Sequence, residues 1–195
     1  MLFFVSAVAF AGTQAEEKLA ASVVASLSKS VSDKAAPRLI FDQHEQGERW
    51  LTDMTARLPK GKPQAETARE FLTTVHYEAS RAGLDPQLVL AVIQHESAFR
   101  KYAVSTVGAR GYMQVMPFWT GVIGKTEHNL FHLRTNIRYG CVILRHYLDR
   151  ENGNLQRALA RYNGSLGRTE YSDAVLSLLR NRWNYGNSTI VTHSE

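Results

Sequence analysis

A single carboxylate stands out because of the apolar residues that precede it. Residues 86–96, PQLVLAVIQHE, are apolar almost throughout, and such a run predicts a buried helix. On that helix Val89, Ile93 and Glu96 follow the i, i+4, i+7 spacing of one face. Burial disfavours the charged form of a carboxyl group and raises its pKa, so Glu96 is expected to keep a proton near neutral pH, as a general acid requires. The alternative is a helix-end glutamate that turns to solvent or pairs with Arg100.

The stretch after Glu96 is both basic and aromatic. No Asp or Glu occurs between Glu96 and Glu127, and the basic residues there are Arg100, Lys101, Arg110 and Lys125. The aromatic residues among them are Phe99, Tyr102, Tyr112, Phe118 and Trp119. Such a segment can hold an anionic polymer or stack on sugar rings. The alternative is that the aromatic rings belong to the core and the charges to a solvated face.

Three segments carry a resemblance to a known family. They are residues 96–99 (ESAF) with 103–117 (AVSTVGARGYMQVMP), residues 136–140 (NIRYG), and residues 158–164 (ALARYNG). In order and spacing they resemble the E-S-x-F…A-x-S-x-x-G-A-x-G-L-M-Q-x-M-P, N-I-x-x-G and A-x-A-x-Y-N-G elements of the soluble lytic transglycosylase catalytic domain. Matches of this length are far more specific than a lone short motif. The one departure is Tyr112, where the family usually has Leu, and a local change in the groove is expected there.

The resemblance implies a lysozyme-like helical fold with an active-site groove, and an enzyme that acts on the glycan strands of peptidoglycan. The implied reaction cleaves the β-1,4 bond between N-acetylmuramic acid and N-acetylglucosamine without water and leaves 1,6-anhydromuramoyl ends. In it, Glu96 protonates the glycosidic oxygen and then removes the proton of the muramoyl 6-hydroxyl. Ordinary glycosidases use two carboxylates. The stretch without Asp or Glu after Glu96 is compatible with a mechanism that uses a single carboxylate. A second carboxylate from Asp149, Glu151 or Glu170 can still fold close to Glu96.

The resemblance also assigns the substrate-binding roles, which fall on Ser97, Ser105, Met113, Gln114, Tyr162 and Asn163. The two serines are expected to bind sugar or steady the acid. Met113 and Gln114 are expected to line the groove. Tyr162 is expected to hydrogen-bond near Glu96, and Asn163 to contact sugar or backbone. Gly108 and Gly111 are expected to let the backbone approach the glycan, because glycine has no side chain.

The pattern of apolar spacing and helix breakers predicts an all-α fold without strands. Helices are expected over residues 16–34, 42–58, 65–82, 86–96, 136–150, 154–162 and 171–183. For residues 16–34, which are rich in Ser and only weakly apolar, partial disorder is the alternative. Gly83 should end the third of these, and Asp85 as N-cap with Pro86 in the first turn should begin the fourth. Residues 103–126 are rich in Gly and contain Pro117, so an ordered loop with short turns is expected.

The N-terminal segment has the features of an export signal. Residues 1–15 are uncharged and largely apolar, and they offer cleavage sites at residues 9–11 (AFA) and 13–15 (TQA). The alternative is a buried N-terminal helix. We expect a signal peptide over residues 1–15, a helical extension over 16–62, a catalytic domain over 63–186 and a tail over 187–195. The expected location is the periplasm or the secreted bacterial envelope, with no transmembrane helix after export.

Composition excludes several classes of protein. The chain has 195 residues, 44% hydrophobic and 21% charged, with a net charge of +5, which is a globular profile. The one cysteine, Cys141, excludes an intramolecular disulfide and a multi-cysteine metal site. His128 and His132 have a spacing that can bind zinc, but no partner ligand pattern accompanies them. His95 and Glu96 begin an H-E-x-x-H pattern, with Phe99 in place of the second histidine. No metal and no cofactor are therefore predicted.

Three other functions compete with the leading one. The first is a hydrolytic muramidase of the same fold. The second is a non-catalytic peptidoglycan-binding scaffold in an envelope machine. The third, a small nucleic-acid binder, depends on charge alone and requires binding that weakens steeply with salt, so no nucleic-acid partner is predicted. The sequence identifies no protein partner and does not distinguish exo from endo cleavage.

Overall fold

The structure is a computed structural model that describes residues 14, 16 and 18–186. The expected signal peptide over residues 1–15, apart from Gln14, and the expected tail over 187–195 lie outside the described residues. Within the described part, no helix is long and apolar enough to cross a membrane.

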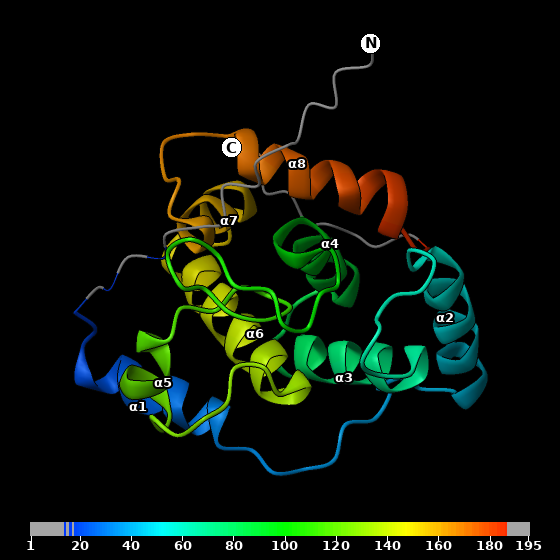
Figure 1. Ribbon diagram of the computed structural model, residues 1–195, viewed down its shortest axis with the longest axis horizontal. Coiled ribbons are helices and arrows are strands. Elements are labelled where there is room, and N and C mark those ends of the chain that lie inside the picture. The colour runs from blue at the N-terminus through cyan, green and yellow to red at the C-terminus, as the bar shows by residue number, and fades with distance from the viewer. Residues whose placement is uncertain (1–13, 15, 17, 187–195) are drawn as a thin grey trace.

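The described residues form eight α-helices followed by one π-helical turn, and no strand. The helices are α1 (Ala21–Val31), α2 (His44–Arg57), α3 (Ala68–Arg81), α4 (Pro86–Ser97), α5 (Phe118–Ile123), α6 (Leu133–Arg150), α7 (Leu155–Asn163), α8 (Glu170–Leu178) and the π-helical η1 (Leu179–Trp183). Figure 1 shows their arrangement around α4 and α6. The all-α prediction is confirmed.

The largest difference from the sequence prediction lies in residues 103–126, which were expected to form a loop with short turns. The structure places helix α5 there, immediately after Pro117. Trp119 and Ile123 on this helix are buried, so the turn is stabilised by packing that the local Gly and Pro content does not reveal. The helix predicted over 171–183 also differs, since α8 passes into η1 at Leu179.

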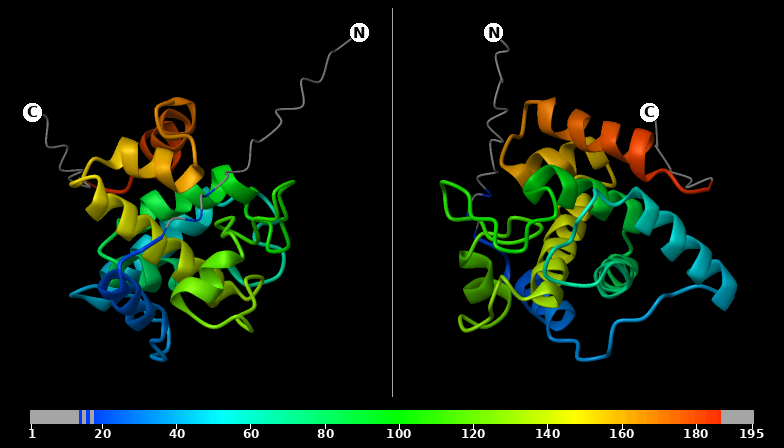
Figure 2. Two further views of the ribbon diagram at one scale, coloured as in Figure 1. Left: turned by 90° about the vertical axis from the view of Figure 1, so that its left-hand side faces the viewer. Right: turned by 45° about the vertical axis from the view of Figure 1, so that its right-hand side comes forward.

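Helix α4 lies at the centre of the fold, as its apolar sequence predicts. The Asp85 side chain accepts a hydrogen bond from the Gln87 backbone N–H, and Pro86 occupies the first turn, so the predicted cap is confirmed. The helix packs against α3, α8 and η1, and α8 lies over α7 and α4 in all three views (Figures 1 and 2). It ends where Ala98 and Phe99 take left-handed backbone angles. This abrupt end fixes the direction of the last turn, which carries Glu96.

The N-terminal extension shares the core of the rest of the chain. Helix α1 packs against α5 and α6, and α2 packs against α3 and η1. Val31, Trp50 and Met54 of the extension are buried in the same hydrophobic cluster as the residues of α4 and α6. One continuous core therefore crosses the boundary expected between residues 62 and 63.

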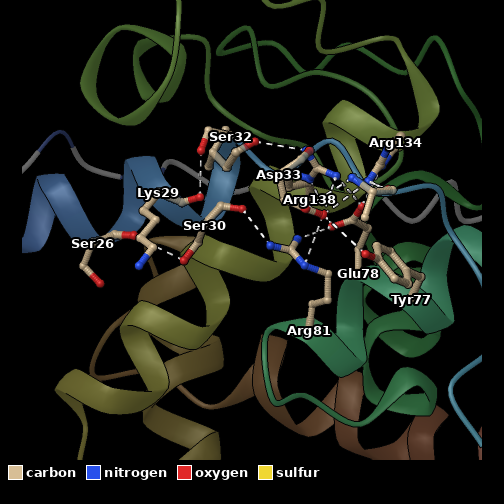
Figure 3. A network of polar contacts seen from close by, with 12 residues as sticks. Ser26, Lys29, Ser30, Ser32, Asp33, Tyr77, Glu78, Arg81, Arg134 and Arg138 are labelled. Atoms are coloured by element: carbon tan, nitrogen blue, oxygen red, sulfur yellow. Dashed lines mark hydrogen bonds and ion pairs between the residues drawn. The ribbon is translucent and has the colours of Figure 1, made fainter.

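A buried charge cluster joins the extension to the two helices beneath it (Figure 3). Glu78 of α3 is buried and accepts hydrogen bonds from Arg138 at 2.8 and 3.1 Å, from Arg134 at 2.9 Å and from Arg81 at 3.0 Å. Arg138 also donates to the Val31 carbonyl at 3.1 Å. Asp33, just after α1, lies 3.4 to 3.7 Å from the same three guanidinium groups. The cluster fastens the end of α1 to α3 and α6.

Candidate active site

Glu96 lies on the last turn of α4 and is only 7% exposed. Burial raises its pKa from 4.5 to about 7, against the smaller effect of a hydrogen bond that favours the charged form. The predicted burial is confirmed, and the alternative of a solvent-facing or Arg100-paired side chain is wrong. Arg100 instead donates from its Nε to the Ser97 carbonyl at 3.0 Å. A carboxyl group with this pKa can donate a proton at neutral pH.

The hydrogen-bond partner of Glu96 is Tyr171, at the start of α8. The Tyr171 hydroxyl donates to Glu96 Oε1 at 2.6 Å. Burial and the neighbouring carboxyl group raise the pKa of Tyr171 well above its usual value, so the phenol stays neutral and keeps its proton for this bond. The sequence analysis did not single out Tyr171, because it lies 75 residues from Glu96 and outside the quoted motifs.

His95 contacts Tyr171 directly. The two rings meet edge to face, with centroids 4.9 Å apart, and burial lowers the pKa of His95. A neutral imidazole ring therefore packs against the tyrosine that holds Glu96. The sequence showed only that His95 precedes the carboxylate.

No second carboxylate in the described part of the chain contributes to the pKa shift of Glu96, which arises from burial and from Tyr171. Of the three acidic residues named from the sequence, Glu151 forms ion pairs with two arginines on α7. Asp149 pairs with Arg145, and Glu170 is exposed at the beginning of α8. Among the described residues, none of these three carboxylates contributes to the pKa shift of Glu96.

Ser105 and Gln114 hold the loop between α4 and α5 in shape. Ser105 Oγ accepts a hydrogen bond from the Ala109 backbone N–H at 3.0 Å. Gln114 Nε2 donates to the carbonyls of Ala103 at 3.2 Å and Gly111 at 2.9 Å. Both side chains thus serve the loop itself, and their predicted contacts with sugar remain predictions.

The position of Met113 corrects a prediction. Its side chain was expected to line the groove, but it is 0% exposed. A Cβ at Gly140 of α6 would lie 2.3 Å from the Met113 sulfur, so the thioether fills the space that the missing side chain leaves. The Tyr162 hydroxyl donates to the Met113 carbonyl at 2.7 Å, and Tyr162 thereby ties α7 to this loop.

Two further predicted residues, Ser97 and Asn163, are buried. Ser97 Oγ donates to the Ile93 carbonyl at 3.1 Å, one turn back along α4. Asn163 is 8% exposed, and its Nδ2 has no acceptor among the described residues. An unpaired buried donor costs about 1–3 kcal/mol. The Asn163 amide is therefore suited to a polar group from outside the chain.

Asn136, at the start of α6, organises the loop from the opposite side. Its Oδ1 accepts from the Met113 backbone N–H at 2.8 Å, and its Nδ2 donates to the carbonyls of Arg110 and Leu130, each at 2.8 Å. A Cβ at Gly111 would lie 2.4 Å from this Nδ2. Gly111 was expected to admit the glycan, but the close approach it permits is to Asn136. The sequence contained Asn136 in a motif without revealing this role.

Tyr112, the departure from the family pattern, lies in the core instead of changing the groove. Its ring packs edge-on against Phe71, with centroids 5.0 Å apart. Its hydroxyl donates to Glu66, which also pairs with Lys101 at 2.6 Å. The extra hydroxyl of Tyr112 thus finds a partner within the fold.

Two of the residues considered for metal binding, His128 and Cys141, lie in surroundings that do not resemble a metal site. His128 Nδ1 lies 2.7 Å from the Tyr139 hydroxyl, and Cys141 is buried in the core. Among the described residues, no group of three or more His, Cys, Asp or Glu side chains could hold a metal ion.

The fold and the site together define a helical protein with one buried, protonatable carboxyl group at the end of its central helix. The chain belongs to the transglycosylase SLT domain family, whose model matches residues 73–174. The resemblance read from the sequence is thereby confirmed.

Similar proteins carry related names. The chain is 35% identical over 104 residues to the transglycosylase of Enterobacteria phage PRD1. It is 46% identical over 54 residues to membrane-bound lytic murein transglycosylase C of Actinobacillus pleuropneumoniae serotype 5b (strain L20). These matches cover 53% and 28% of this chain, and only 38% and 15% of the two relatives. The chain also resembles a solved structure, that of an inactive mutant of lytic transglycosylase Slt from Pseudomonas aeruginosa, with 28% sequence identity and a TM-score of 0.46. This match covers 69% of this chain and 23% of that chain.

Proposed function

We propose that this chain cleaves the β-1,4 bond between N-acetylmuramic acid and N-acetylglucosamine in peptidoglycan and leaves 1,6-anhydromuramoyl ends. The observation that carries the proposal is the burial of Glu96, which holds its pKa at about 7. Membership of the transglycosylase SLT domain family supports the substrate class and a lysozyme-like groove. The relatives named murein transglycosylases support the same reaction.

In the proposed reaction Glu96 acts twice. Its protonated carboxyl group donates the proton to the glycosidic oxygen while the bond from that oxygen to the anomeric carbon breaks. The resulting carboxylate removes the proton of the muramoyl 6-hydroxyl, and that oxygen forms the new bond to the anomeric carbon. Glu96 ends protonated, so no water is consumed and no second carboxylate is required. Tyr171 acts as a positioning residue, since its hydrogen bond orients the carboxyl group throughout.

Substrate contacts are proposed for Ser97, Ser105, Gln114 and Asn163. The support is strongest for Asn163, because its buried Nδ2 has no acceptor among the described residues. A sugar hydroxyl or acetamido oxygen supplies the missing acceptor. We place the activity in the periplasm or the secreted bacterial envelope, and the cleavage patterns in residues 1–15 support export.

The test is the chemistry of the product ends. Purified peptidoglycan is digested with the wild type and with Glu96→Gln, the released fragments are treated with borohydride, and their masses are measured. Anhydro ends resist reduction, so the wild type should give fragments unchanged by borohydride and Glu96→Gln should release none. Reducible muramic acid ends would identify a hydrolase instead. Failure of the wild type to release any fragment would favour a binding scaffold.

A further inference from the structure

A cavity of about 430 Å³ lies between the N-terminal extension and helix α6. Its walls come from three segments: the end of α1 with the residues after it, the connection from α5 to α6, and the first turns of α6. Helix α1 packs against both α5 and α6, and Figure 1 shows α1 beside α5. None of the residues placed in the candidate active site lines this cavity. Its volume is within the range of sites that bind small molecules.

The inner wall of the cavity is largely apolar. Val31 of α1, Ile123 of α5 and Tyr139 of α6 line it, and each is at most 4% exposed. The Tyr139 hydroxyl already pairs with His128 Nδ1 at 2.7 Å, so Tyr139 offers a ligand its ring and not a free hydroxyl. Such a wall favours a ligand with an aliphatic body, because removal of apolar surface from water drives binding.

The mouth of the cavity carries positive charge. Lys34 and Lys125 line it from different segments, and both are exposed. In the described part of the chain, neither ammonium group forms an ion pair. Glu127 is close to Lys125 in the sequence, but it is exposed and does not line the cavity. The mouth therefore offers two cationic groups to a ligand.

The charged groups on the remaining wall do not cancel the two lysines. Asp33, Arg134 and Arg138 also line the cavity and belong to the buried charge cluster of Figure 3. That cluster sets three guanidinium groups against the carboxylates of Glu78 and Asp33. Its guanidinium groups already bind these carboxylates and nearby backbone carbonyls. An incoming anion therefore finds the two lysines as its open partners.

We propose that this cavity binds an aliphatic carboxylate, with its hydrocarbon chain on the apolar inner wall and its head group between Lys34 and Lys125. A carboxylate has two oxygens, and each can accept a hydrogen bond from one ammonium group. The site shares no residue with the one proposed for glycan cleavage. A ligand here contacts the extension and α6 together, and it stabilises the folded chain because it binds only the folded state.

The test uses the full chain with ¹³C-labelled isoleucine and valine methyl groups, and hexanoate is the probe. A titration followed by NMR should show saturable shifts of the Ile123 and Val31 methyl resonances and give a Kd. The double variant Lys34→Gln with Lys125→Gln should raise this Kd at least about fivefold, the size expected when two partly exposed ion pairs are lost. Both positions are exposed, so the variant should fold, and its methyl spectrum reports whether it does.

The matched control is the double variant Lys18→Gln with Lys60→Gln. It removes the same charge from two exposed positions that do not line the cavity, so the Kd for hexanoate should not change. Two further probes divide the ligand. Acetate keeps the head group and loses most of the chain, whereas 1-hexanol keeps the chain and loses the charge. Each should bind at least about fivefold more weakly than hexanoate.

Several outcomes would overturn the proposal. An unchanged Kd in Lys34→Gln with Lys125→Gln, or an equal rise in the control variant, would mean that these two lysines do not hold the head group. Equal binding of acetate would indicate general attraction of anions, and equal binding of 1-hexanol an apolar cavity without an anion site. Absence of shifts at Ile123 and Val31 would place any binding elsewhere. No peptidoglycan is used, so this result is separate from the test of the proposed function.

Discussion

Two features of the site shift the pKa of Glu96 in opposite directions. Its burial at the end of α4 disfavours the carboxylate, whereas the hydrogen bond from Tyr171 favours it, and together they leave the pKa at about 7. At that value both protonation states are populated near neutral pH, which suits a group that must first donate and then accept a proton. The same burial lowers the stability of the folded chain wherever the unfolded chain ionises the group.

The first prediction concerns that cost in stability. The folded-state pKa of Glu96 lies above its ordinary value of 4.5, so the folded chain holds the proton more tightly. Stability from this group is full below pH 4.5 and is lost as the pH rises to about 7, by about 3 kcal/mol in total. The Glu96→Gln variant has no ionisable group at this position, so it does not lose this stability as the pH rises. Urea denaturation of both proteins at pH 4.5 and pH 8 should therefore show the variant gaining stability relative to the wild type at the higher pH. Equal differences at both pH values would contradict the assignment.

The second prediction concerns Tyr171. Removal of its hydroxyl in Tyr171→Phe deletes the hydrogen bond that favours the Glu96 carboxylate, so the pKa of Glu96 should rise. The activity against peptidoglycan should then fall at its maximum, because the acid is less well oriented, while the loss of activity at alkaline pH should move to a higher pH. Rates measured from pH 5 to pH 9 check this. A purely structural role would lower the rate without moving the profile.

At the level of helices and loops, the sequence predicts those features of the fold that depend on residues close together in the chain. The cap at Asp85 and Pro86, the glycine at 83 and the apolar run through α4 are local signals, and the structure confirms the helix they predict. Tyr171 and Asn136 act through side chains distant in sequence, and their partners follow only from the packing of α8 and α6. The hydrogen bond from the Trp119 indole N–H to Gln14 Oε1 is equally beyond prediction from neighbouring residues, because the two lie 105 residues apart in the sequence.

The third prediction tests the role of Asn136 in shaping the loop. The Asn136→Ala variant leaves the Met113 N–H and two carbonyl groups without their partner. At about 1 kcal/mol for each bond, the free energy of unfolding should fall by about 3 kcal/mol, and activity should fall with it. Asn181→Ala removes an exposed hydrogen bond to Ser177 and should change stability by less than about 0.5 kcal/mol. Similar effects of the two changes on the urea midpoint would show that the loop does not depend on Asn136.

For the molecule as a whole, the N-terminal extension is part of the packing. The sequence predicts a boundary between residues 62 and 63. The basis is the segment 59–63 (PKGKP), where Pro and Gly interrupt the helices, and this signal concerns the backbone alone. The structure shows side chains of α1 and α2 in the same core as α4. Apolar spacing indicates which face of a helix is buried, but it does not indicate which other helix covers that face. Arg138, which is paired with Glu78 60 residues away in the sequence, also binds the Val31 carbonyl at the end of α1.

The last prediction tests whether that charge cluster holds the extension in place. In Glu78→Gln the three arginines lose their buried counter-charge, so stability should fall by about 3 kcal/mol. Because Arg138 also binds the Val31 carbonyl, hydrogen exchange of the α1 amides should accelerate more than that of α4. Arg69→Ala, which breaks an exposed pair with Glu48, is the control and should leave both readouts unchanged. The double variant Glu78→Met with Arg138→Met should recover part of the loss, since apolar side chains can replace a buried ion pair. Uniform exchange across α1 and α4 in Glu78→Gln would mean that the cluster supports the core in general and not the extension in particular.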